Sequence, residues 1–194
     1  MSSTAVFKSA SQALHVSYII QNMPATSQSP TAAVINRLKR ELAPWDGIQT
    51  DHTATVNWGS LNPLEVRAQC AQVVSMVNHL GHEAERAACR AIYGHQVEKA
   101  NGVRSMASYL EPVIGRGTDF CLYVAWHVFM RPEQRQGVTQ RDIAEQFGVS
   151  LRTVEGDCSK MRKYGVSLHK RALDGLTDRF MRGGLIPDPE EVAV

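Results

Sequence analysis

The sequence predicts an all-α fold, a helical bundle, and three observations lead to that prediction. Apolar residues recur along most of the chain at the spacing that gives a helix one apolar face. Capping residues, prolines and glycines stand where those patterns begin and end. Only one short stretch, TATVNW at residues 53–58, alternates as a strand would, and it does so weakly.

The first part of the chain, residues 1–61, contains helical segments joined by irregular ones. Apolar positions at helical spacing predict helices over residues 11–22 and 31–42. The stretch from Pro24 to Pro30 between them is rich in Ser, Thr and Pro, which is typical of a linker. Residues 44–61 show no helical period and are expected to be irregular.

Residues 62–113 are expected to form a central helical body. Asn62 is a good N-cap, Pro63 suits the first helical position, and Glu65 stands where a capping box requires it. The predicted helices cover residues 62–80, 83–93 and 103–110, the last of them broken before Pro112. The first two are expected to pack together as a helical hairpin.

Residues 114–184 are expected to form a second helical unit, and residues 185–194 a flexible acidic tail. An apolar helix, Phe120–Met130, begins this unit, with Thr118 or Asp119 as its cap. The aromatic side chains of this helix recur at helical spacing, which favours a place in the core over a stacking platform for nucleic-acid bases.

Two short helices joined by a tight turn are predicted at residues 139–164. Thr139 can cap the first helix, with Asp142 three residues on. Gly148 falls where the backbone must pass through the left-handed region, and Ser150 can cap the second helix. The predicted helices cover residues 140–146 and 151–163, and a separate trailing helix is expected at 168–181.

The second of these helices carries a buried stripe, Val154, Cys158 and Met161, at helical spacing. This arrangement is that of a helix-turn-helix, in which the start of the second helix enters the major groove of DNA. Arg152 is the expected guanine or phosphate contact, and the lysines that follow can pair with phosphates. The expected DNA-binding residues are Gln140, Arg141, Ser150, Leu151, Arg152, Thr153, Glu155, Gly156, Ser159, Lys160, Arg162 and Lys163.

The distribution of charge agrees with this assignment. The whole chain has a net charge of only +2, which excludes a histone-like polycation. Residues 131–182 hold 11 Lys and Arg against 7 Asp and Glu, so much of the basic surplus lies around the motif. Glu155 and Asp157 argue against DNA binding, because carboxylates on a DNA-reading helix repel phosphate. A helical hairpin that only packs is therefore the alternative for this segment.

The motif resembles the helix-turn-helix of sigma-factor region 4 and of LuxR-type regulators. The resemblance rests on Gln140, Ile143-Ala144, Gly148-Val149-Ser150, Thr153-Val154 and Cys158, and it covers about 30 residues. It implies sequence-specific binding to double-stranded DNA and a role in transcription regulation.

The chain as a whole is similar to phage late-gene antiterminators of the Q type, which bind DNA near a promoter and load onto RNA polymerase. That similarity implies RNA polymerase as a protein partner. Alternatively, the helices before the motif, in residues 62–113, bind a second copy of the chain to form a homodimer. A structural DNA-binding adaptor, such as a phage packaging protein, is the alternative function. Such adaptors usually place the motif at the N-terminus, which favours the regulator.

Other function classes find little support in the sequence. The four cysteines are widely separated, so free buried thiols in a cytoplasmic protein are expected instead of a zinc site or disulfides. No run of about 18 apolar residues exists that would span a membrane. No nucleophile elbow or phosphate loop is present, so neither an enzyme nor a cofactor or metal is expected.

Overall fold

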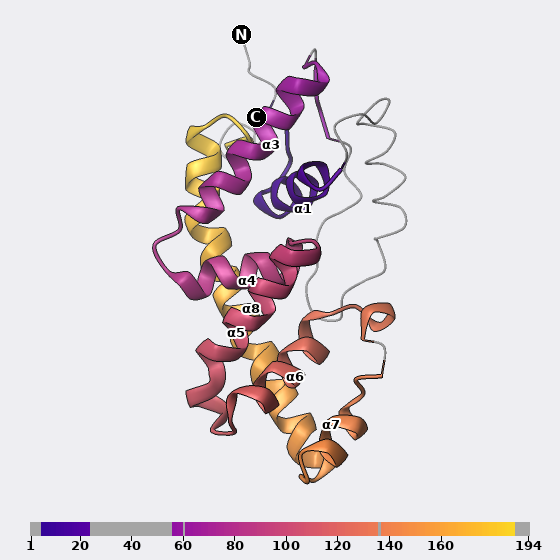
Figure 1. Cartoon of the computed structure of the whole chain (residues 1–194). Helices are drawn as coiled ribbons and strands as arrows, with labels where there is room; N and C mark the ends of the chain where they lie inside the picture. Colours follow the sequence, from indigo (N-terminus) through magenta and orange to yellow (C-terminus); the bar gives the residue numbers. More distant parts are fainter. Residues whose placement is uncertain (1–4, 24–55, 60, 136, 189–194) are drawn as a thin grey trace. The chain divides into compact units, whose positions relative to one another are not determined.

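The computed structural model describes residues 5–23, 56–59, 61–135 and 137–188 (Figure 1). Within these ranges every regular element is helical and there is no strand, so the all-α prediction is confirmed for this part of the chain. The helix predicted at 31–42 and the linker before it lie outside the described residues. Only residues 56–58 of the TATVNW stretch are described, and they form no strand.

The chain divides into two compact units. Unit 1 comprises Met1–Gly81 together with Leu173–Val194, and unit 2 comprises His82–Ala172. These bounds differ from the division expected from the sequence, which keeps residues 62–113 together. In the sequence, unit 2 is thus inserted into unit 1. The second boundary, between Ala172 and Leu173, falls inside the last helix, α8 (Leu151–Arg182).

Unit 1 is built on the packing of α1 (Ala10–Gln21) against α3 (Pro63–Asn78). The α3 capping box is as predicted: the Asn62 side chain accepts from the Glu65 backbone N–H, and the Glu65 carboxylate accepts from the Asn62 N–H at 2.7 Å. The backbone N–H of Phe7 donates to the carbonyl of Leu185 at 2.9 Å. Leu185 and Ile186 are buried, so the expected flexible tail cannot begin at residue 185.

Unit 2 contains α4 (Glu83–Tyr93), α5 (Gln96–Ile114), α6 (Thr118–Phe129), the short 3₁₀ helix η1 (Pro132–Gln134), α7 (Gln140–Gln146) and the first part of α8. Helices α4 and α5 approach closely at Gly102, where an added Cβ would lie 2.4 Å from the backbone nitrogen of Ala91. Glycine lets the two backbones meet there. Helix α5 also packs on α6, so a boundary at residue 114 would cut through one core.

Several predicted helix pairings and ends are wrong. The hairpin expected from residues 62–93 does not form, because α3 packs against α1 and α4 packs against α5. Helix α5 continues through Pro112 and ends at Ile114. Gly115 is its C-cap, with a φ of 72°, and donates its N–H to the Glu111 carbonyl. Pro112 and Ser108 are both exposed, so water can satisfy the Ser108 carbonyl that Pro112 leaves without a donor.

The predicted cap of α6 is also wrong. Gly117, not Thr118 or Asp119, is the N-cap residue. The Thr118 hydroxyl instead donates to the Glu111 carboxylate at 2.9 Å, which ties the start of α6 to the end of α5. The aromatic side chains behave as predicted in part: Phe120 and Phe129 are buried, while Tyr123 and Trp126 are half-buried.

Unit 2 buries several polar groups with partners. The Lys99 ammonium donates to the Ala91 carbonyl at 2.9 Å, Arg171 pairs with Glu85 at 3.3 Å, and the Tyr93 hydroxyl lies 2.8 Å from His169 Nε2. Burial lowers the pKa of His169 to about 4, so its ring is neutral at pH 7.

All four cysteines are free and buried, as predicted. Burial raises the pKa of Cys70 to about 11 and that of Cys89 to about 12, which keeps both thiols protonated and unreactive. Among the described residues, no helix is long and apolar enough to cross a membrane.

Candidate nucleic-acid interface

Helix α7 begins with the capping box that the sequence predicts. The Asp142 carboxylate accepts from the Thr139 backbone N–H at 2.8 Å, and the Thr139 hydroxyl oxygen accepts from the Asp142 N–H at 3.2 Å. The hydrogen bonds from Thr139 hold the pKa of Asp142 below its ordinary value. This reciprocal cap fixes where α7 starts, and the helix ends at Gln146, as predicted.

The connection from α7 to α8 is a tight turn centred on Gly148, whose φ is 63°. The Val149 N–H donates to the Ala144 carbonyl at 3.0 Å, which closes the turn. Ser150 then caps α8, because its hydroxyl oxygen accepts from the Thr153 N–H at 3.2 Å. The turn and its left-handed glycine agree with the sequence-based prediction.

We expect Gly148→Val to destabilise the protein by about 1–2 kcal/mol, because a β-branched residue is strained at positive φ. No atom lies within 4 Å of an added Cβ, so the effect comes from the backbone alone. Gly148→Asn is the matched control, since asparagine tolerates the left-handed region. Thermal unfolding measures the difference, and equal melting temperatures for the two variants would contradict this account of the turn.

The α7–α8 corner packs onto α6. Val154, Cys158 and Met161 are almost fully buried, as the predicted stripe requires. The Phe147 ring meets Phe120 and Tyr123 edge-on, with centroids 5.3 and 5.4 Å apart. On the other side, His127 Nδ1 lies 3.0 Å from the carbonyl of Val138, just before α7. Helix α6 is thus the third helix of the corner.

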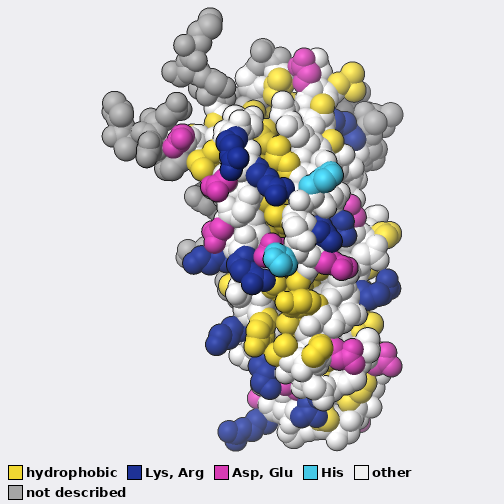
Figure 2. All heavy atoms as spheres, turned by 90° about the vertical axis from the view of Figure 1, so that its left-hand side faces the viewer, with side chains coloured by type: hydrophobic (Ala, Val, Ile, Leu, Met, Phe, Trp, Pro, Cys, Tyr) yellow, Lys and Arg dark blue, Asp and Glu magenta, His cyan; other side chains and the backbone are white. Residues whose placement is uncertain are grey.

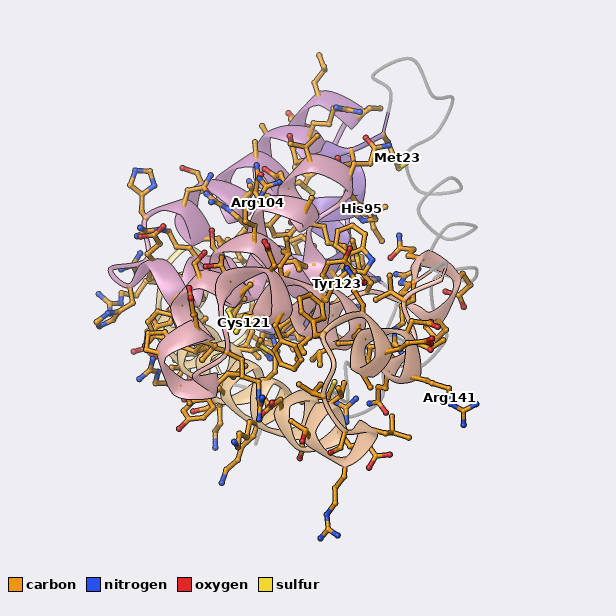
Figure 3. The ribbon with its side chains drawn as sticks, turned by 60° about the horizontal axis from the view of Figure 1, so that its bottom comes forward. Met23, His95, Arg104, Cys121, Tyr123 and Arg141 are labelled. Carbon is orange, nitrogen blue, oxygen red and sulfur yellow. The ribbon has the colours of Figure 1, made fainter. Side chains whose placement is uncertain are left out.

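The predicted DNA-binding residues gather on the start of α7 and the first half of α8. Most are exposed: Arg141, Ser150, Leu151, Arg152, Glu155, Gly156, Ser159, Lys160 and Lys163. Figure 3 shows Arg141 extending from α7 away from the ribbon. Gln140, Thr153 and Arg162 are half-buried. Gln140 is also a hydrogen-bond partner of the Cys158 thiol, so its side chain is drawn inward.

Asp157 is not on the exposed face, although the sequence raised it as an objection to DNA binding. Its carboxylate is buried and accepts from Arg116 at 2.9 Å and from Lys160 at 3.3 Å. Arg116 also lies over the Phe120 ring. Since Arg116 precedes Asp157 by 41 residues, no local pattern in the sequence signals this pair. The carboxylate charge is therefore neutralised inside the corner, away from its exposed face.

A groove runs beside this ion pair, with a volume of about 610 Å³. Its lining comes from two places, the α5–α6 loop with the start of α6, and the α7–α8 turn at Phe147 and Val149. The Gly115–Gly117 turn lies next to the corner and contributes Arg116 to it.

No protein-family model matches this sequence, and no curated protein matches it. Within the part of the chain that the structure describes, no group of His, Cys, Asp or Glu side chains could hold a metal ion.

Proposed function

We propose that this protein binds double-stranded DNA with the α7–α8 corner acting as a helix-turn-helix, and that it regulates transcription. One observation carries the proposal. The first turns of α8 bury Val154, Cys158 and Met161 and leave an exposed face with an unpaired arginine, Arg152, between small and polar residues. An arginine among small and polar residues near the N-terminus of a helix is typical of helices that enter the major groove.

Three exposed side chains at the start of α8, those of Leu151, Arg152 and Glu155, are complementary to groups on base edges. The Arg152 guanidinium can donate two hydrogen bonds to guanine O6 and N7. Leu151, which is 39% exposed, can contact a thymine methyl group, and the Glu155 carboxylate can accept from the cytosine amino group. Gly156 and Ser159 leave room for the helix to approach the bases. Arg141 at the start of α7 is placed for a phosphate.

The test begins by selecting DNA ligands from a random-sequence duplex library with the full chain. On the selected site, Arg152→Ala should weaken binding about 5- to 150-fold, which corresponds to about 1–3 kcal/mol for one bidentate base contact. On random DNA the loss should be smaller, because only a charge is removed.

Arg104→Ala on α5 is the control. Arg104 is exposed, donates only to its neighbour Asn101, and carries the same charge, so this variant should bind both DNAs like the unaltered chain. Failure of the unaltered chain to enrich any sequence would contradict the proposal. If Arg152→Ala lost the same affinity on selected and random DNA, the assignment of Arg152 to a base contact would be wrong.

Regulation of transcription, as the role of this binding, rests on the resemblance to sigma-factor region 4 and LuxR-type regulators. Loading onto RNA polymerase, as in Q-type antiterminators, is the form of regulation we propose. RNA polymerase retained by the tagged full chain from purified mixtures would support this role. Retention of a packaging enzyme instead would support the structural adaptor.

A further inference from the structure

Helix α8 is continuous from Leu151 to Arg182, although the sequence predicts two separate helices there. Continuity places later residues in a fixed register with Arg152. Lys163 and Lys170 follow Arg152 by about three and five full turns, so all three side chains lie on one line along the helix. All three are exposed, and none has an ion pair or hydrogen bond with any other residue that the structure describes.

The exposed side of α8 is basic over residues 156–173 and carries both signs after that, where Arg179 and Arg182 accompany the acidic residues. Between Glu155 and Asp174 the sole acidic residue of the helix is Asp157, which is buried and paired. Gly156, Ser159 and Ser167 separate the basic residues on the exposed side. Asp174 and Asp178 then appear, both exposed. In the lower half of Figure 2, Lys and Arg side chains recur along the left edge of the molecule.

A solvated helix normally intersperses both signs and gains from pairs three or four residues apart. Lys163 has no acidic residue three or four positions away along the helix. Asp174 follows Lys170 by four residues, but the two described side chains form no ion pair. Arg171 lies about 100° around the helix from the line through Lys163 and Lys170, and it is paired with Glu85. Lys163 and Lys170 thus form no ion pair and extend the side of α8 on which Arg152 is proposed to contact bases. Basic side chains in this position are complementary to the phosphate backbone of the same duplex.

We propose that DNA contact continues along α8 beyond the base-reading turns, with Lys163 and Lys170 binding successive phosphates, and that it ends before Asp174. Lys170 lies about 27 Å along the helix from Arg152, at 1.5 Å per residue, whereas the major groove is about 12 Å wide. Lys170 therefore contacts phosphates outside the base pairs that Arg152 reads. The inference rests on the proposed function and extends its footprint.

The test compares Lys163→Ala, Lys170→Ala and the exposed Lys8→Ala control from unit 1 in the full chain, on the selected duplex across a range of salt concentrations. Each α8 variant should lower the slope of log affinity against log salt by about 0.9 and weaken binding about fivefold at about 0.15 M salt. The loss should be the same on random DNA. Lys8→Ala should change nothing.

Two further measurements locate the contact. Shortening the flanks of the selected duplex should weaken the unaltered chain and abolish the effect of Lys170→Ala, while the effect of Arg152→Ala remains. Asp174→Asn should strengthen binding, because it removes a carboxylate within a Debye length of the bound backbone. If Lys170→Ala and Asp174→Asn both bind like the unaltered chain while Arg152→Ala does not, this inference is wrong and the proposed function stands. If the unaltered chain selects no DNA, both fall.

Discussion

Gly102→Ala is expected to destabilise the protein by about 3 kcal/mol or more, since overpacking a close contact costs about 1–3 kcal/mol where side chains can move and more where they cannot. The added Cβ would lie 2.4 Å from the Ala91 backbone nitrogen and 2.8 Å from the Arg90 carbonyl carbon. These are backbone atoms of α4, so relief requires α4 and α5 to separate. Urea unfolding followed by circular dichroism measures the loss.

Gly156→Ala is the matched control, because it makes the same chemical change in another helix. Gly156 is exposed and no atom lies within 4 Å of an added Cβ. Alanine should therefore stabilise α8 by up to about 1 kcal/mol through its higher helix propensity. If Gly102→Ala were as stable as Gly156→Ala, the close α4–α5 approach would be wrong.

Lowering the pH from 7 to 4 is expected to cost about 3 kcal/mol of stability through His169 alone. Burial lowers the pKa of His169 from 6.5 to about 4 in the folded chain, and each pKa unit corresponds to about 1.4 kcal/mol. The unfolded chain therefore binds the proton first. This contribution is complete above about pH 6.5, falls as the pH drops towards 4, and does not change further below that value.

The measurement is the free energy of unfolding at several pH values, for the unaltered chain and for His169→Gln. Carboxylates also titrate in this range, so the quantity of interest is the difference between the two curves. Glutamine does not titrate and can still hydrogen-bond to the Tyr93 hydroxyl, which lies 2.8 Å from Nε2. Parallel curves between pH 6.5 and 4 would show that His169 is not held neutral.

The parts of the fold that could be predicted from the sequence are those set by local chemistry. Asn62, Thr139 and Ser150 cap their helices with their own side chains, so the starts of α3, α7 and α8 follow from neighbouring residues. The same holds for the exposed side of α8, because the buried stripe of Val154, Cys158 and Met161 defines the opposite side of the helix. Neither prediction depended on distant parts of the chain.

The parts that could not be predicted depend on distant contacts. The sequence predicts separate helices at 151–163 and 168–181, and Gly165 lies between them. An added Cβ at Gly165 would lie 2.6 Å from the Phe129 ring. The glycine is therefore a packing position inside α8, and the helix passes through it. The Arg116–Asp157 pair is likewise non-local, and without it Asp157 seemed to oppose DNA binding. Pairing of α3 with α1 also joins segments on either side of a long stretch of sequence.

The insertion of unit 2 into unit 1 has a consequence for the order of events on the ribosome. All of unit 2 emerges before Leu185, whose carbonyl accepts from the Phe7 N–H. At about 5–20 residues per second, Phe7 waits on the order of 10 to 30 seconds for that partner. During this interval α1 and α3 must stay packed together without the C-terminal residues that complete unit 1. A nascent chain released before Leu185 is made would thus contain all of unit 2 but an incomplete unit 1. Chaperones and proteases would act on the incomplete unit.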